Sequence, residues 1–372
     1  MGSSQEIYNR IEEKLESIIE YDDVRHLRNL MWVVVGIIQQ ESVNLSKIAQ
    51  SIPGETKAQS RVTKIRRWLM NENIDVWQYY QAILGRILKN WRDKDIKVIV
   101  DGVSVFGDRF QIFRLSIAHG CRAFPLHWTI IAGKGLTTAQ ALQPIFEQAA
   151  EFLKGRVRSV TLLADRGFRD YDWAELCLAV GWHYNIRIAV NTTVWLEKGI
   201  ICRIDELGVK FGQPQFHQNV LLTLEAEFET NLSVTWTNDG KELLAVISDK
   251  RANRARLSEY GVRMQIEESF RDDKSGGFDL DHSRLLHADR LSRLLLAEAI
   301  ATLWCYELGE RCLSGGDEVR RIVDPAWHRE LSIFQLGLRW LHRCLATALD
   351  LLPNFLARLS PIILKPIIKG VS

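Results

Sequence analysis

One segment, Tyr260 to Lys274 (YGVRMQIEESFRDDK), holds four polar side chains whose types and spacing could do chemistry. Tyr260, Arg263, Glu267 and Lys274 follow one another at intervals of three, four and seven positions. On one α-helix these intervals predict a single stripe, because each residue turns the chain by about 100°. A hydroxyl, two cations and a carboxylate along the edge of a cleft suit a polyanion and a metal ion. An apolar stripe lies beside the polar one and would bury the helix: Val262, Ile266 and Phe270.

Two aspartates upstream each follow an apolar run that reads as a buried strand. Asp101 comes directly after Lys97–Val100, and Asp165 comes after Val160–Ala164 in the sequence SVTLLADRGF. Ligands of α/β proteins bind where strands end at the carboxyl edge of a sheet. Both carboxylates are therefore predicted at that edge. The stretch between Asp165 and Glu267 exceeds what one helix and one strand require, which predicts an insertion.

The pattern Y(2)R(3)E(6)K, together with the DRGF box, resembles the signature of the bacterial cut-and-paste DDE transposases whose catalytic glutamate lies in a YREK motif. The resemblance implies a ribonuclease H-like α/β core, a mixed sheet with flanking helices, whose catalytic residues are Asp101, Asp165 and Glu267. It also implies cleavage at the ends of an insertion sequence, a hairpin intermediate, and strand transfer into target DNA.

Three carboxylates suit two Mg²⁺ ions about 3.5 to 4 Å apart, which would clamp the attacking and leaving oxygens of a phosphodiester. Hard oxygen ligands select Mg²⁺, with Mn²⁺ as a substitute. Asp101 is expected to bridge the ions, and Asp165 and Glu267 to hold mainly one each. Glu268 is the competing ligand, but it lies about 100° around the helix from Glu267, away from the polar stripe.

The remaining motif residues are assigned to phosphate. Arg263 is expected to grip a phosphate bidentately, Tyr260 to donate a hydrogen bond, and Lys274 to neutralise a DNA phosphate. The alternative is a surface ion pair within the helix, such as Arg263 with Glu267. Ser275-Gly276-Gly277 could stop the helix at or before Lys274.

Residues 1–95 are predicted to form an all-helical DNA-binding domain, with helices near residues 7–20, 24–40 and 44–50. A break at Ser51–Gly54 precedes a basic helix, and a short helix, a turn and a basic helix resemble a helix-turn-helix module. The alternative is a solvated basic face on a helical bundle. The basic positions are Lys57, Arg61, Lys64, Arg66 and Arg67.

Four further regions complete the predicted organisation. Residues 96–190 form the first part of the catalytic core, 191–250 a β-rich insertion domain, 251–312 the second part with the glutamate helix, and 313–372 a C-terminal helical region. Trp236 lies within the insertion. The resemblance implies that an aromatic residue of the insertion receives a flipped base, and Trp236 is the candidate for this role. The alternative is a tryptophan of the core. Six further basic residues either reach DNA or face water: Arg284, Arg290, Arg293, Arg339, His342 and Arg343.

Composition permits this organisation without demanding it. The chain has 372 residues, a net charge of +2 and six cysteines with no CxxC pair or zinc-like spacing. The scattered cysteines, and the absence of a signal peptide or a segment long enough to span a bilayer, favour a reduced bacterial cytoplasm without membrane contact.

The sequence therefore predicts a DNA transposase, with terminal inverted repeats and target DNA as partners and a homodimer in the synaptic complex. Two alternatives remain open: a metal-dependent nuclease without strand transfer, and a non-catalytic DNA-binding protein derived from a transposase. The intact Asp101, Asp165 and Glu267 argue against the second.

Overall fold

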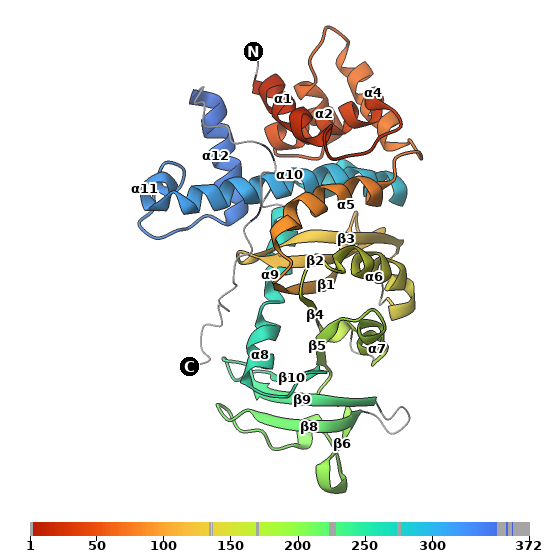
Figure 1. Cartoon of the computed structure of the whole chain (residues 1–372), viewed down its shortest axis with the longest axis vertical. Helices are drawn as coiled ribbons and strands as arrows, with labels where there is room; N and C mark the ends of the chain where they lie inside the picture. The colour runs from red at the N-terminus through yellow and green to blue at the C-terminus, as the bar shows by residue number, and fades with distance from the viewer. Residues whose placement is uncertain are drawn as a thin grey trace.

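The computed structural model describes residues 3–133, 135, 137–168, 171–222, 228–273, 277–347, 355 and 359. Its centre is one mixed sheet of ten strands in the order β3-β2-β1-β4-β5-β10-β9-β8-β6-β7, with helices on both faces (Figure 1). The predicted α/β class is thus confirmed as a large mixed sheet with flanking helices. The strands are β1 Asp95–Val105, β2 Phe110–His119, β3 Arg122–Ala132, β4 Ser159–Ala164, β5 His183–Ile188, β6 Thr193–Leu196, β7 Ile200–Arg203, β8 Gln215–Leu222, β9 Phe228–Trp236 and β10 Leu243–Ser248.

The strand directions divide the sheet into two parts. β1, β2 and β3 form an antiparallel meander, whereas β4 runs parallel to β1 and β5 parallel to β4. β10 then pairs antiparallel with β5 and starts a second antiparallel part that runs through β9, β8, β6 and β7. The strands of the predicted insertion therefore extend the central sheet from the edge of β5.

Side chains alternate across β1 as the pleat requires. Val98 and Val100 face the main core, while Ile99 packs with Leu163 against the other face of the sheet. Asp101 lies inside β1, which corrects the prediction that the strand ends before it. The parallel pairing of β1 with β4 does end at Val100, but hairpin pairing with β2 carries β1 on to Val105.

Two pairs of helices cover the two faces of the central strands. α6 (Ala139–Leu153) and α7 (Tyr171–Ala179) lie on one face, and α8 (Arg254–Gly261) and α9 (Met264–Asp273) lie on the other (Figure 1). Thr138 caps α6 by accepting a hydrogen bond from the Ala141 N–H.

The amino-terminal helices form a bundle on the far side of α10 (Ala288–Ser314) from the sheet (Figure 1). The predicted helices at 24–40 and 44–50 are confirmed, with Asp23 capping α2 and Asn44 capping α3, whereas the first helix ends at Leu15 and not near residue 20. α10 is buried from Leu294 through Glu310, because the bundle and the sheet enclose it from two sides. The bundle comprises α1 Ser3–Leu15, α2 Val24–Gln40, α3 Leu45–Ile48 and α4 Ala58–Leu69, and α5 Val76–Ile87 leads from it to β1.

Two helices follow α10 in the described part of the chain. They are the short α11 (Gly316–Arg321) and α12 (Ile333–Thr347). α12 crosses α10 so closely that a Cβ on Gly337 would lie 1.7 Å from the Cys305 carbonyl oxygen. In the part of the chain that is described, no helix is both long and apolar enough to cross a membrane.

Candidate active site

The segment that carries the tyrosine, arginine and glutamate is two helices, which corrects the prediction of one. α8 ends at Gly261, and α9 begins at Met264. Glycine is a poor helix former, and the next amide groups bond three residues back, Val262 to Glu259 and Arg263 to Tyr260. This tight turn redirects the chain. The three side chains therefore meet around the turn between two helices.

Arg263 lies at the centre of the three predicted carboxylates. Its Nη1 is 3.2 Å from Asp101 Oδ2, and its Nη2 is 2.5 Å from Glu267 Oε1 and 4.0 Å from Asp165 Oδ2. Only 7% of the Arg263 side chain is exposed, whereas 45% of the Glu267 side chain is. Residues from β1, from the end of β4 and from α9 thus share one buried cation.

Burial and charge act in opposite directions on the two aspartates. Burial raises the pKa of Asp101, and the nearby Asp165 and Glu267 charges add to this, although the Gly102 N–H and Arg263 oppose it. Burial also tends to raise the pKa of Asp165, but Arg263 and hydrogen bonds outweigh it, so that pKa is lowered. The site therefore stabilises the charge of Asp165 better than that of Asp101.

Tyr260 and Arg187 complete the contacts of Asp165. The Tyr260 hydroxyl donates to Asp165 Oδ1 at 3.1 Å, and burial raises the pKa of this phenol, which keeps it a donor. Arg187 Nη1 lies 3.8 Å from the same oxygen. Sequence reasoning missed Arg187. Its signal was available, because Arg187 stands near the end of β5 on the same face as Asn185, beside the strand that ends before Asp165.

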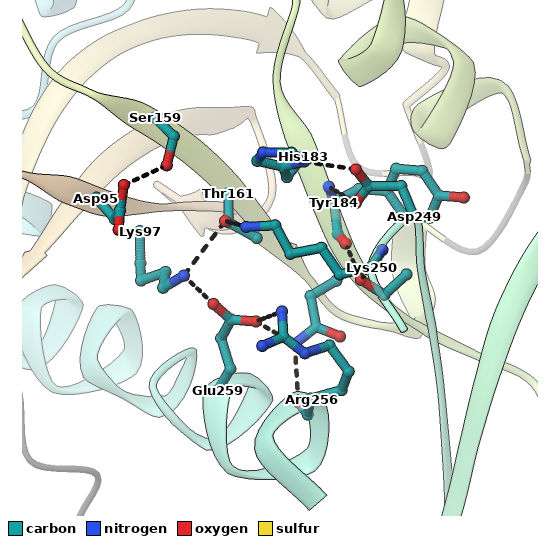
Figure 2. A network of polar contacts seen from close by, with 12 residues as sticks. Asp95, Lys97, Ser159, Thr161, His183, Tyr184, Asp249, Lys250, Arg256 and Glu259 are labelled. Carbon is teal, nitrogen blue, oxygen red and sulfur yellow. Dashed lines mark hydrogen bonds and ion pairs between the residues drawn. The ribbon is translucent and has the colours of Figure 1, made fainter. Parts of the chain in front are cut away.

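A polar network holds α8 against the sheet (Figure 2). Lys97 of β1 pairs with Glu259 and donates to Thr161 Oγ1 of β4 at 3.2 Å. Arg256 Nη1 lies 2.7 Å from Glu259 Oε2, and Asn185 of β5 donates to the Arg256 carbonyl oxygen at 2.8 Å. Glu259 directly precedes Tyr260, so this network sets where the helix turn begins.

Lys97→Met is expected to lower the rate of metal-dependent DNA cleavage about tenfold while leaving DNA affinity nearly unchanged. The substitution removes one of two cations from a Glu259 side chain that is only 9% exposed, so α8 shifts and misplaces Tyr260 and Arg263. Cleavage of a labelled duplex gives the rate, and fluorescence anisotropy gives the affinity. Lys89→Met, at an exposed lysine, is the matched control, and equal rates for both variants would refute the anchoring role.

The opposite side of α9 is fixed to the β2–β3 hairpin. Arg122 Nε lies 2.8 Å from Asp272 Oδ2, and Arg114 Nη1 lies 2.5 Å from Asp273 Oδ2. Glu268 points to the same side, 3.6 Å from Arg122 Nη2. Of the two adjacent glutamates, Glu267 is thus the one that contacts Arg263 beside Asp101 and Asp165.

Asp272→Asn is expected to flatten the pH dependence of stability. Burial raises the pKa of Asp272 to about 6 from an ordinary value of 3.8. The folded state thus binds the Asp272 proton more tightly than the unfolded state does. The stability that protonated Asp272 contributes is present below pH 3.8 and lost as pH rises through 6. Urea unfolding should show that the free energy of unfolding falls by about 2 to 3 kcal/mol more for wild type than for the variant between these two pH values. Parallel curves for both proteins would contradict this.

Trp236, the predicted acceptor for a flipped base, contacts the core and the backbone in the structure. Trp236 at the end of β9 packs half-buried against the main core, and its indole N–H donates to the Val209 carbonyl oxygen at 2.6 Å. Glu242, at the end of the turn that follows β9, forms an ion pair with Arg187, which lies near Asp165. Lys274 lies outside the described residues.

The five basic residues predicted to contact DNA lie on α4 or directly before it. Lys57 occupies the position before the helix, and Arg61 donates to the Gly54 carbonyl oxygen at 3.0 Å. α3, the turn and α4 follow one another as the sequence predicts. Lys64 and Arg67 line a surface pocket of about 490 Å³ between α4 and the start of α2. The remaining basic residue of the set, Arg66, is exposed near the end of α4.

The donor set, three carboxylates from three segments, fits a hard divalent cation such as Mg²⁺ or Mn²⁺. Within the described residues, no three His, Cys, Asp or Glu side chains are arranged around a common metal position. Arg263 lies between the carboxylates instead. Asp101, Asp165 and Glu267 are the residues that would hold a metal.

Fold and site together define a mixed α/β protein with an acidic site on the central strands of its sheet. Residues 126–304 match the model of a protein family, the transposase DDE domain. This match supports a DDE transposase. It includes Asp165 and Glu267 and begins after Asp101.

The likeness of the chain to solved structures is remote. Among the solved structures to which the chain is similar is one titled a cryo-EM structure of the piggyBac transposase synaptic complex with hairpin DNA. The two share 9% sequence identity over 93% of this chain and 79% of the other, with a TM-score of 0.42. No curated protein matches the chain significantly.

Proposed function

We propose that this protein is a DNA transposase that cleaves transposon ends and joins them to target DNA by a cut-and-paste route. The observation that carries the proposal is the convergence of Asp101, Asp165 and Glu267 on Arg263, from segments far apart in the chain. The family match over residues 126–304 supports the same class.

In this proposal β3-β2-β1-β4-β5 is a ribonuclease H-like core, and the bundle with α4 binds the terminal inverted repeats. Bound Mg²⁺, two ions per site, would supply Lewis-acid stabilisation of the attacking and leaving oxygens. The protein works as a homodimer on two transposon ends, and the reaction passes through a DNA hairpin. The gene belongs to a bacterial insertion sequence, and the protein acts in the cytoplasm. Trp236 and Lys274 are proposed to contact the flipped base and the strand phosphate.

The chain's own residues hold and orient the reacting groups. Asp101, Asp165 and Glu267 provide acceptor oxygens, and Tyr260 fixes the orientation of Asp165 through its hydrogen bond. Arg263 has a planar guanidinium that pairs with a phosphate in the same bidentate way as with a carboxylate. It can therefore neutralise the acids in the free protein and grip DNA in the complex.

The test uses a plasmid that carries the gene with its flanking DNA, incubated with the purified protein, Mg²⁺ and a second target plasmid. Double-strand release of the segment and its appearance in the target support transposition. Cleavage without joining would leave the nuclease as the function. Binding without any metal-dependent cleavage would leave a DNA-binding protein derived from a transposase.

A further inference from the structure

A basic pocket of about 200 Å³ lies where the end of α4 meets the start of α10. Three arginines line it, Arg66 from α4, Arg284 from the preceding loop and Arg290 from α10. Two exposed apolar side chains share the lining, Met70 at 50% and Leu286 at 61% exposure. The pocket therefore combines positive charge with uncovered apolar surface.

None of the three guanidinium groups is in an ion pair among the described residues, although the Asp289 carboxylate lies near enough to Arg290 for the two charges to attract. Within the same part of the chain, none of them makes a hydrogen bond, and the Nε of Arg290 is buried without a partner. The adjacent acid, Asp289, is already 2.9 Å from Arg293 Nη1. Like charges gathered around one concavity repel one another unless an anion joins them. The electrostatics of the pocket thus favour an anionic ligand.

The walls of the pocket are fixed relative to each other. The same Arg293 Nη1 donates to the Leu69 carbonyl oxygen at the end of α4, at 2.8 Å, and its side chain is only 8% exposed. Arg284 has a φ of 54°, a left-handed conformation that a non-glycine residue adopts at a cost of about 1 kcal/mol. A preformed pocket loses little conformational entropy when it binds a ligand.

We propose that this pocket binds a backbone phosphate of duplex DNA and thereby ties the DNA on α4 to the helix that supports the catalytic sheet. Guanidinium groups bind phosphate bidentately, and the start of α10, which has no side-chain cap at His287, adds a favourable helix dipole. Met70 and Leu286 suit the apolar edge of a deoxyribose. The inference rests on the proposed function, because it assumes DNA as the partner.

Arg66 connects the pocket to the basic surface of α4. This arginine belongs both to the pocket and to the basic set of α4. A duplex that contacts α4 therefore reaches the pocket without leaving the basic surface. A phosphate contact here would fix register and orientation and would not read sequence.

The test compares DNA binding by the double variant Arg284→Gln/Arg290→Gln with that of wild type, using a fluorescein-labelled mixed-sequence duplex over a range of salt concentrations. We expect about tenfold weaker binding at low salt. The slope of log K against log salt should decrease by about one, because the variant neutralises one phosphate fewer. The full chain is used throughout, and thermal melting confirms that each variant is folded.

Arg92→Gln/Arg329→Gln is the matched control, since it removes the same charge from two exposed arginines outside the pocket. A pocket variant that binds like this control, keeps the wild-type salt slope, or differs only because it has unfolded would overturn the inference. Failure of wild type to bind the duplex would also overturn it.

The plasmid excision assay separates this inference from the proposed function. If wild type excises DNA and the pocket variant binds DNA as wild type does, the phosphate-binding role of the pocket is refuted and the transposase function stands. A pocket variant with weaker, less salt-dependent binding, in a protein that never cleaves, would support the pocket and refute the transposase.

Discussion

Asp101→Asn should lower the rate of Mg²⁺-dependent DNA cleavage by about a thousandfold. The asparagine keeps the size of the side chain and the oxygen that accepts the Gly102 N–H at 2.8 Å, but it removes the negative charge. Losing several kcal/mol of transition-state stabilisation corresponds to a change of this size. Arg263 keeps Glu267 and Asp165 as partners, so the fold should persist. Single-turnover cleavage of a labelled transposon end, with circular dichroism for folding, measures the effect.

The two adjacent glutamates provide an internal control for this result. Glu267→Gln should reproduce the loss seen for Asp101→Asn, because Glu267 contacts the same arginine. Glu268→Gln should keep at least about a third of the wild-type rate, because Glu268 pairs with Arg122 and Arg271 on the other side of α9 and such partly exposed pairs contribute little. If Glu268→Gln is the inactive variant instead, the register assigned to α9 is wrong.

Local patterns in the sequence predicted the elements that position the site. The apolar runs before Asp101 and Asp165 specify β1 and β4, since buried parallel strands need continuous apolar residues. Val262, Ile266 and Phe270 specify the buried side of the glutamate segment, and they pack on Ile99 and Leu163 of the sheet. These predictions depend on residues close together in the chain.

Features that depend on distant contacts escaped prediction. The break between α8 and α9 follows from Gly261 together with the network that holds Glu259 on the sheet, and Lys97 of that network is far away in sequence. The extension of β1 past Asp101 depends on its hairpin with β2. Propensity alone could not reveal either, because tertiary contacts decide where an element ends.

The role of Arg263 shows most clearly what sequence could not provide. Spacing assigned Arg263 to phosphate, and the alternative assigned it to Glu267 alone. The structure gives it three carboxylates at once, which requires the middle of β1 and the end of β4 to meet the turn between α8 and α9. Only the folded sheet brings Asp101 and Asp165 together beside that turn.

This arrangement leads to an unusual expectation for Arg263→Gln: tighter binding of metal together with slower cleavage. A guanidinium within 4.0 Å of three carboxylates competes with any other cation for them. Two unit charges about 4 Å apart interact by roughly 4 kcal/mol at an effective dielectric constant near 20, so removing the competitor should raise Mn²⁺ affinity at least about tenfold. The lost phosphate grip should meanwhile slow cleavage by about a hundredfold.

Titration of the DNA-free protein with Mn²⁺, followed by electron paramagnetic resonance, measures the first effect, and cleavage at saturating Mn²⁺ measures the second. Arg271→Gln is the matched control, because this arginine lies on α9 but among the described residues forms an ion pair with Glu268 and no other acid, with 67% of its side chain exposed. A fall in both affinity and rate would mean that Arg263 supports the metal-binding geometry instead of competing with the ion. A rise in affinity with a fall in rate would identify Arg263 as the counterion of the free site and as a ligand of DNA in the complex.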